Sequence, residues 1–291
     1  MLSILKSLFI GSLSLTNLNN TEYVKYHNSL NLSYQLGLNQ FIDREYANEF
    51  HLNNSHFIVT NSSQRELFDE ESYIVNSSID WRDNHKVTTV KNQGSCGDCW
   101  AFSSVGAVES AWAIKNNVLF NLSQQELLDC SYMNKGCKGG SMDLAFKYIM
   151  NNGLCTNLSY PYIAEREFCQ KNDCEPVIQI KEYRDVTQNN EKALARAVSK
   201  QPISVAIQAN KRSFQLYQSG IYNDPDCGTE LDHGVLLVGY GTDRDLNMDY
   251  WIIKNSWGKE WGENGYIKIQ RNIDDERGLC GIAMQSSYPI V

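Results

Sequence analysis

The chain has 291 residues, of which 42% are hydrophobic and 21% are charged. This is an ordinary globular composition, with enough chain for one or two domains and a sizeable core. The formal net charge is −8, and Lys and Arg do not cluster. Nucleic acid is therefore not expected as a main partner, because phosphate binding needs a basic surface. No apolar run approaches the roughly 20 residues that a membrane-spanning helix needs, so no membrane span is expected.

Nine cysteines and seven N-x-S/T sequons favour the secretory route. Disulfides persist in oxidising compartments and are rare in the cytosol. Because nine is an odd number, four disulfides would leave one free thiol. The sequons lie at Asn19, Asn31, Asn53, Asn61, Asn76, Asn121 and Asn157. They add weak support, since an asparagine-rich sequence produces sequons by chance.

The N-terminal quarter of the chain carries few packing signals. Residues 1–16 contain one lysine followed by a short apolar stretch, which resembles a signal peptide, and a truncated or irregular N-terminus fits them equally. The next residues, 17–75, are polar and rich in asparagine, with helix-like segments near 20–30 and 43–50. Residues 52–79 are typical of an exposed linker, which favours proteolytic nicking.

The segment from residue 99 to 153 is mainly helical in pattern. Apolar residues at helical spacing predict a helix that starts at Cys99 and buries one face. The residues that carry this spacing are Ala101, Val105, Val108 and Trp112. Residues 123–126 form a Ser-Gln-Gln-Glu capping box, in which the serine and the glutamate each satisfy a backbone N–H. A third helix is predicted over 143–152, ended by Gly153.

The C-terminal part changes to β-strand patterns after a predicted helix at 191–199. Apolar residues alternate over 203–207 and 267–269, and the continuous apolar run at 234–241 suits a buried strand. A helical half followed by an antiparallel β half predicts an α+β protein with a cleft between two lobes.

The most informative chemical feature is the segment QGSCGDCW at the start of the first predicted helix. The positive end of a helix dipole favours the thiolate form of a cysteine there, and a cysteine nucleophile needs that form. A zinc site would need a second pair of ligands, which the later cysteines and the five histidines do not supply at suitable spacing. A redox pair of Cys96 and Cys99 would need a βαβ context, which is missing. If Cys96 and Cys99 were both ordinary disulfide-bonded cysteines, the odd number of cysteines would be unexplained.

Three motifs resemble the active-site segments of papain-family, cathepsin L-like cysteine proteases. They are QGSCGDCWAF at 93–102, LDHG at 231–234 and WIIKNSWGKEWGENGY at 251–266. The resemblance covers residues 76–291, and the order and separation of the motifs match those of the family. It implies a two-lobed papain-like fold, with a helical left lobe and an antiparallel, β-barrel-like right lobe, and it implies neither a metal nor a cofactor.

The resemblance also implies a role for each matching residue. Cys99 would attack the scissile carbonyl carbon. His233 would pair with the thiolate as an imidazolium and protonate the leaving amine. Asn255 would orient the histidine ring, and Trp257 would shield that hydrogen bond from water. Gln93 would donate a side-chain N–H to the oxyanion, beside the backbone N–H of Cys99.

The cysteine pairing is implied by the same resemblance, because spacing alone does not determine it. The implied disulfides are Cys96–Cys137, Cys130–Cys169 and Cys227–Cys280. Cys155 and Cys174 remain for a fourth pair, which leaves Cys99 free.

Substrate binding is implied for a further set of residues. They are Gly139, Gly140, Met142, Ala206, Leu231, Trp257 and Gln285. The two glycines would pair with an extended substrate as an added strand would. The pocket for the side chain two residues before the scissile bond would have Met142, Ala206 and Leu231 as walls and Gln285 at its base. Apolar walls and a neutral base predict a preference for Leu, Val or Phe.

Asp98 departs from the family pattern, which has a small residue at that position. An anion suits a helix N-terminus but opposes ionisation of the neighbouring thiol. At partial exposure the repulsion is on the order of a kcal/mol, which would raise the thiol pKa by somewhat under about one unit. Replacing Asp98 by serine is therefore expected to move the acidic limb of the pH–rate profile downward.

The N-terminal region resembles the family's inhibitory propeptide in part. Residues 20–28 fit the second half of its long-helix motif, and residues 37–43 fit the motif that packs above the cleft. In the first half of the helix motif, the expected Glu, Arg and Phe are replaced by Leu8, Ser12 and Thr16. The propeptide therefore looks truncated, and its ability to fold and inhibit stays open.

The sequence thus predicts the zymogen of a papain-like cysteine endopeptidase. Residues 1–16 would be a signal-like or truncated start, 17–75 a partial propeptide and linker, and 76–291 the peptidase domain, released by cleavage near 73–77. We expect a monomer in a lysosome, a vacuole or outside the cell. Its partners would be polypeptide substrates, its own propeptide and cystatin-like inhibitors. A catalytically silent scaffold protein and a thiol–disulfide oxidoreductase using Cys96 and Cys99 are the alternatives.

Overall fold

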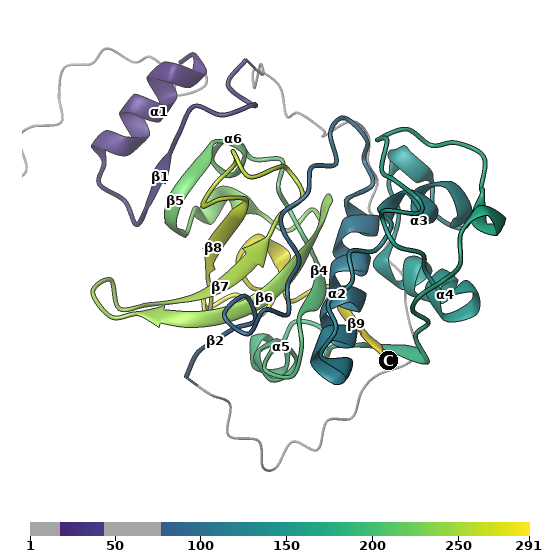
Figure 1. Ribbon diagram of the computed structural model, residues 1–291. Helices are drawn as coiled ribbons and strands as arrows, with labels where there is room; N and C mark the ends of the chain where they lie inside the picture. Colours follow the sequence, from purple (N-terminus) through teal and green to yellow (C-terminus); the bar gives the residue numbers. More distant parts are fainter. Residues whose placement is uncertain (1–17, 44–76) are drawn as a thin grey trace, which may run out of the picture.

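The computed structural model describes residues 18–43 and 77–291 (Figure 1). Its helices are α1 (Asn20–Ser29), α2 (Cys99–Asn116), α3 (Gln124–Cys130), α4 (Met142–Asn152), α5 (Glu191–Val198) and α6 (Arg212–Gln215). Its strands are β1 (Tyr34–Leu36), β2 (Ile79–Asp80), β3 (Glu182–Asp185), β4 (Ile203–Ile207), β5 (Tyr217–Tyr222), β6 (His233–Asp243), β7 (Met248–Lys254), β8 (Tyr266–Gln270) and β9 (Ser286–Ile290). Short 3₁₀ turns lie at Gly136–Lys138, Lys171–Asp173, Pro225–Cys227 and Leu279–Gly281.

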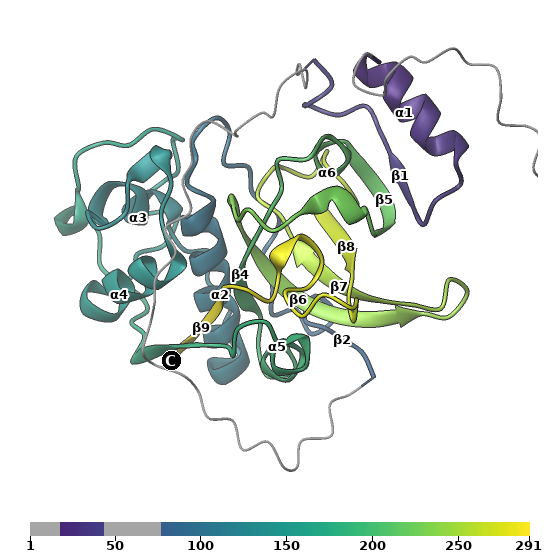
Figure 2. The same ribbon diagram turned by 180° about the vertical axis from the view of Figure 1, so that it is seen from behind.

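The helical lobe is built around α2, and α3 and α4 pack on the side of α2 that faces away from most of the strands (Figure 2). The three predicted helices of this lobe are therefore present. The helix α2 is buried on more than the single apolar face that was expected, because polar side chains such as Ser104 and Glu109 are buried as well. The reason is that α2 lies between the lobes and packs against β4, β6 and β9 in addition to α3 and α4.

The capping box predicted at the start of α3 forms only in half. The Ser123 hydroxyl accepts from the Glu126 N–H at 3.0 Å, as expected. The Glu126 carboxylate accepts instead from the Cys155 N–H and the Tyr148 hydroxyl, and the Ser123 N–H donates to the Cys155 carbonyl at 3.0 Å. A complete capping box occurs at α1, where Asn19 and Glu22 each accept from the other's backbone N–H.

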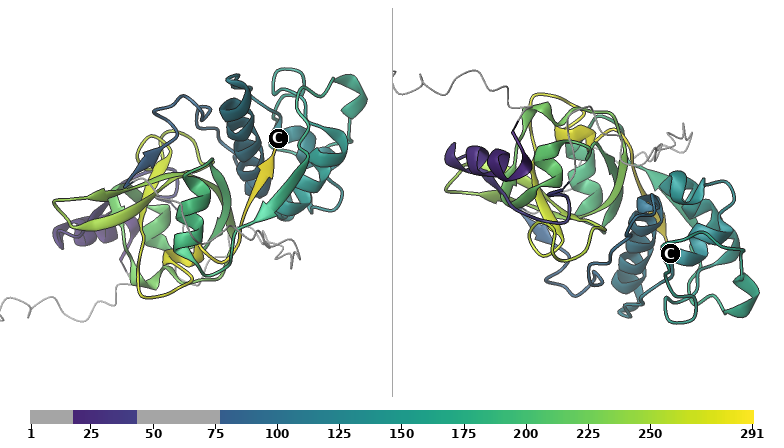
Figure 3. Two further views of the ribbon diagram at one scale, coloured as in Figure 1. Left: turned by 90° about the horizontal axis from the view of Figure 1, so that it is seen from below. Right: turned by 90° about the horizontal axis from the view of Figure 1, so that it is seen from above.

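The β lobe is a nine-stranded sheet in the order β1-β5-β8-β7-β6-β4-β9-β3, with β2 paired to β6. The expected barrel-like closure is absent among the described strands, since the order runs from β1 to β3 without its ends meeting. The sheet is also mixed rather than wholly antiparallel, because β5 and β8 pair in parallel. Figure 3 shows α2, α3 and α4 gathered on one side of the molecule and the strand-rich lobe on the other.

The N-terminal segment of residues 18–43 lies on the β lobe and shares its core (Figure 1). Strand β1 adds to the sheet by antiparallel pairing with β5. Four of its apolar side chains are buried with those of the lobe: Val24, Tyr34, Leu36 and Phe41. Residues 18–43 therefore fold against the β lobe, although the sequence before them departs from the long-helix motif.

Several sequence predictions lie outside the described residues. They are the signal-like start at 1–16, most of the helix at 43–50, most of the linker at 52–79 and most of the cleavage region at 73–77. Within residues 18–43 and 77–291, no helix combines the length and apolar character that crossing a bilayer requires.

Candidate active site

Cys99 is the first residue of α2, and its sulfur is a free thiol. All nine cysteines lie in the described residues, and the other eight form the disulfides Cys96–Cys137, Cys130–Cys169, Cys155–Cys174 and Cys227–Cys280. Three of these are the pairs that the resemblance implied, and Cys155–Cys174 is the pair that remained. Because Cys96 is bonded to Cys137, it is not the redox partner of Cys99. The odd cysteine is thus the one at the helix start.

His233 begins β6 and faces the same cleft as Cys99. The two residues line a cavity of about 600 Å³ between the lobes. The N–H of Gly234, next to His233, donates to the Cys99 sulfur at 3.3 Å. The two lobes therefore bring the thiol and the start of β6 into direct contact, although the residues are far apart in the sequence.

Asn255 and Trp257 hold the histidine ring. The His233 Nε2 lies 2.8 Å from Asn255 Oδ1, and because a carboxamide oxygen only accepts, Nε2 carries the proton. The Trp257 ring stacks on the His233 ring with centroids 4.7 Å apart. Both residues are buried, so the hydrogen bond is kept from water and Nδ1 remains for the cleft.

Burial favours the neutral forms of both reacting groups in this arrangement. It raises the pKa of the Cys99 thiol to about 12 and lowers the pKa of His233 to about 4. The Gly234 N–H acts in the opposite direction on the thiol, because it stabilises the thiolate. An ionised pair would therefore have to form jointly, each charge stabilising the other.

Gln93 lines the same cavity, and its side-chain amide is held at both ends. Its Oε1 accepts from the Ser256 hydroxyl at 2.6 Å, and its Nε2 donates to the Cys96 carbonyl at 2.8 Å. Ser256 was not singled out from the sequence, although it lies between two residues that were. The two contacts fix the orientation of the amide, so its second N–H points in one defined direction.

Comparisons with known proteins agree with this geometry. A family model described as papain family cysteine protease matches residues 75–290. The chain belongs to the papain family of cysteine proteases. It is 48% identical to the probable cysteine protease RD21B of Arabidopsis thaliana over 93% of its own length, and it spans 59% of the length of that relative. It is also 48% identical to the thiol protease SEN102 of Hemerocallis sp., with 88% of this chain and 74% of the relative covered.

A solved structure supports the papain-like fold and the precursor state. It is the crystal structure of the Amb a 11 cysteine protease, a ragweed pollen allergen, in its proform. The TM-score is 0.85 at 39% identity, with 94% of this chain and 86% of that chain covered. The sequence-based expectation of a two-lobed papain-like protease precursor is confirmed.

Asp98 departs from the papain pattern, and the sequence-based expectation is that its side chain is partly exposed. The structure contradicts this expectation. The Asp98 side chain is fully buried and makes no capping bond to α2. Both carboxyl oxygens lie 2.9 Å from the Tyr162 hydroxyl, a partner that the sequence did not indicate because it lies 64 residues away. The premise of a partly solvated charge at Asp98 is therefore wrong.

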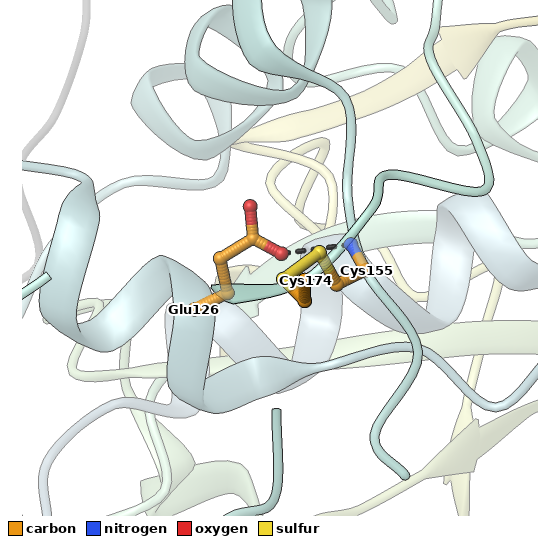
Figure 4. A group of neighbouring side chains, drawn as sticks. All are labelled: Glu126, Cys155 and Cys174. Carbon is orange, nitrogen blue, oxygen red and sulfur yellow. Dashed lines mark hydrogen bonds between the residues drawn. A yellow bond between two sulfur atoms is a disulfide. The ribbon is translucent and has the colours of Figure 1, made fainter. Parts of the chain in front are cut away.

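Figure 4 shows a group of possible metal ligands, Glu126, Cys155 and Cys174, in the helical lobe. The two sulfurs are bonded to each other at 2.02 Å, so neither is a thiolate ligand. The Glu126 carboxylate accepts from the Cys155 N–H at 2.7 Å and from Tyr148 at 3.0 Å. These two donors offset the cost of burying the Glu126 carboxylate. The group is therefore a disulfide next to a hydrogen-bonded carboxylate and not a metal site.

The two glycines expected to pair with substrate differ in their surroundings. Gly139 already uses its N–H toward Gly136 and its carbonyl toward Lys135. Both backbone groups of Gly139 are therefore engaged within the chain. At Gly140, a side chain would come within 3 Å of Asn134 and Trp100, so only glycine fits.

The residues expected as walls of the substrate pocket share one apolar cluster, and they are not among the residues that line the cavity with Cys99 and His233. Met142 and Ala206 belong to one apolar cluster, and Leu231 packs against it. Gln285 is buried nearby, its backbone carbonyl accepting from the Ala206 N–H at 2.9 Å. Both polar atoms of the Gln285 side chain lack a hydrogen-bond partner, which is unusual for a buried amide.

The propeptide segment reaches the cleft through residues 40 and 41. Gln40 Nε2 donates to the Trp257 carbonyl at 2.7 Å, and the Phe41 ring meets the Trp257 ring edge-on at 4.9 Å. Both residues line the cavity that contains Cys99 and His233. The segment thus contacts the same tryptophan that covers the histidine.

Proposed function

We propose that this chain is the precursor of a cysteine endopeptidase in which Cys99 and His233 cleave peptide bonds. One observation carries the proposal. The chain's single free thiol lies at the start of α2, in one cavity with a histidine that Asn255 and Trp257 hold. This combination supplies a nucleophile, a base and an orienting group.

In the proposed reaction, the Cys99 thiolate attacks the scissile carbonyl carbon while His233 is an imidazolium. The oxyanion that forms accepts from the Gln93 side-chain N–H and the Cys99 backbone N–H. Collapse of this intermediate breaks the C–N bond, His233 gives its proton to the leaving amine, and a thioester remains. Water then attacks the thioester carbonyl while His233 takes up a proton from it. Collapse of this second tetrahedral intermediate breaks the C–S bond, which releases the acid product and regenerates the Cys99 thiolate and the His233 imidazolium.

The proposed specificity is for Leu, Val or Phe at the second residue before the scissile bond. The apolar walls from Met142, Ala206 and Leu231 favour such side chains. Gln285 adds no charge to attract arginine. Gly140 would bind the backbone of the same substrate residue as an added strand does.

The alternatives are less well supported. A redox pair of Cys96 and Cys99 is contradicted by the Cys96–Cys137 disulfide. A catalytically silent scaffold would not need Gln93 and an Asn255-bound His233 in one cavity with a free thiol.

We also propose that the protein travels the secretory route, to a lysosome, a vacuole or the cell exterior. Four disulfides in the described residues suit an oxidising compartment. We further propose that the protein is a monomer and that cystatin-like proteins inhibit it. The domain limits proposed are 17–75 for the propeptide and linker and 76–291 for the peptidase.

The test is to mature the full chain and treat it with a peptidyl epoxide that alkylates papain-like cysteines. We expect labelling at Cys99 alone and loss of peptidase activity. A Cys99→Ala variant is the matched control and should show neither labelling nor activity. A wild-type protein that folds but is neither labelled nor active would identify the scaffold instead.

A further inference from the structure

The buried side chain of Asp98 takes part in a hydrogen-bonded chain that ends at Gln93. The Tyr162 hydroxyl lies 2.9 Å from each Asp98 carboxyl oxygen and 3.0 Å from the Gln93 backbone carbonyl. Asp98 lies directly before Cys99, and Gln93 carries the amide proposed for the oxyanion. The chain therefore links two parts of the proposed catalytic centre on the α2 side of the cleft.

The protonation state of Asp98 decides how the hydrogen bonds among Asp98, Tyr162 and Gln93 are arranged. A phenol has one proton to donate, whereas the carboxylate of Asp98 and the carbonyl of Gln93 both accept. If Asp98 is ionised, only one of the two acceptors receives the Tyr162 proton. If Asp98 is protonated, its O–H donates to the Tyr162 oxygen and the Tyr162 O–H donates to the Gln93 carbonyl. The backbone N–H of Asp98 also interacts with its carboxyl group and favours the ionised form. Only the protonated state, however, lets Tyr162 hydrogen-bond to the carboxyl group and to the Gln93 carbonyl at the same time.

The surroundings favour the same state. Asp98 is fully buried, and the Phe102 ring meets the Tyr162 ring edge-on at 5.0 Å. The titratable side chains that the carboxyl group faces are Tyr162 and, beside it in the chain, the Cys99 thiol; neither is a cation that would hold a carboxylate. Burial raises the pKa of Asp98 to about 8.

We propose that Asp98 works as a neutral carboxylic acid, a positioning residue that donates to Tyr162 and thereby holds the Gln93 carbonyl and its loop. This inference rests on the proposed roles of Cys99 and Gln93. Tyr162 is the relay, and it contributes no proton to the reaction. The carboxyl group is compatible with a neighbouring thiolate only because it is uncharged.

Ionisation of Asp98 has two consequences, and both reduce activity. The Tyr162 proton turns toward the carboxylate, so the Gln93 carbonyl loses its donor. A negative charge also appears next to Cys99, which raises the pKa of the thiol and disfavours the thiolate. The enzyme therefore keeps its activity at acidic and neutral pH and loses it on the alkaline side as Asp98 ionises.

The experiment compares the matured wild-type protein with Asp98→Asn, whose amide N–H can still donate to Tyr162 but does not ionise. The pH profile of kcat/KM is measured from about pH 5 to about pH 10. We expect the alkaline limb to move upward by about one pH unit in Asp98→Asn, which corresponds to about tenfold in kcat/KM near pH 9. The acidic limb should stay in place. At about pH 6, Asp98→Asn should exceed Asp98→Ala, because only asparagine restores the donor.

A second measurement does not depend on activity. Infrared spectra of the full chain carrying Cys99→Ser should show a protonated carboxyl band that is present at about pH 6, lost with a midpoint near pH 8 and absent when Asp98→Asn is added. The difference between the two proteins isolates Asp98 from Asp185 and Asp232, whose pKa values burial raises to about 7. Superimposable alkaline limbs overturn the proposal, and so does an unchanged band. Failure of the proposed protease function would instead show as inactivity of the wild type with this band intact.

Discussion

At the residue scale, the proposed chemistry depends on how burial is offset around each polar group. Cys99, His233, Asn255 and Gln93 are all buried, and burial alone disfavours their charged or unpaired forms. The structure offsets this with specific donors, such as the Gly234 N–H for the sulfur and the Ser256 hydroxyl for the Gln93 amide. The centre is thus ordered before any substrate enters.

Gln93 provides the first prediction. Gln93→Ala removes one of two proposed donors to the oxyanion, so kcat should fall by about 10²–10³-fold while KM changes little. Steady-state kinetics on a peptide with leucine at the second position measures this. Gln188→Ala, at an exposed turn residue, is the matched control and should behave as the wild type. A loss confined to KM would show that Gln93 binds substrate in its ground state instead.

At the element scale, the N-terminal segment is attached by three kinds of contact. Strand β1 extends the sheet beyond β5, apolar side chains enter the lobe's core, and Arg212 of α6 donates to Asn20 and to the Leu18 carbonyl at 2.8 Å each. The helix α1 needs these contacts, because a ten-residue helix is marginal on its own.

Phe41 provides the second prediction. Phe41→Ala removes a buried ring that contacts Trp257, which should weaken docking of the segment by about 3 kcal/mol. Epoxide labelling of Cys99 in the uncleaved chain should therefore become faster. Leu38→Ala is the matched control, since Leu38 lies three residues away and is 63% exposed. Equal acceleration by both variants would contradict a specific role of Phe41.

His27 of α1 provides a prediction about pH. Its side chain is buried, with Nε2 3.3 Å from the Tyr34 carbonyl, and burial lowers its pKa below the ordinary value. The docked segment then binds fewer protons than the free one, so docking is full above about pH 6.5 and weakens as the pH falls below it. Labelling of Cys99 in the uncleaved chain should accelerate on acidification.

The variant His27→Gln tests the cause of this pH dependence. Glutamine can donate to the Tyr34 carbonyl and does not titrate near neutral pH. The acceleration below about pH 6.5 should therefore be smaller in His27→Gln than in the wild type. An identical pH dependence of labelling in both proteins would assign the effect to another group.

At the scale of the whole molecule, α2 joins the two lobes into one cooperative unit. It is buried on most sides because both lobes pack on it, and the proposed nucleophile lies at its first residue. Apart from Cys130, which ends α3, the disulfide-bonded cysteines lie outside the α-helices and strands. The Cys155–Cys174 pair beside Glu126 is one example (Figure 4).

The Cys155–Cys174 disulfide provides a stability prediction. It closes a loop with a sequence separation of 19, so replacing both cysteines by serine should lower the free energy of unfolding by about 3 kcal/mol. Urea unfolding of the full chain on a Cys99→Ser background measures this, with the Cys99→Ser protein alone as the control. An unchanged midpoint would mean that the Glu126 contacts hold the loop without the bond.

The sequence alone indicated the helices α2 and α4, the strands β4 and β6, the papain family and the free thiol. Those features depend on local spacing or on motifs that are contiguous in the chain. It did not indicate the open, mixed sheet, the half-formed capping box of α3 or the burial of Asp98. Each of these depends on a partner far away in the sequence: β5 beside β8, Cys155 beside Glu126, and Tyr162 beside Asp98.

By itself, then, the amino-acid sequence determined which residues are able to do chemistry and in what order they occur. Only the tertiary structure decided which of them share a cavity and which side chains are ionised there. The physical reason is that a side chain's ionisation follows from its desolvation and its hydrogen-bond partners, and both are set by residues brought together from the two lobes.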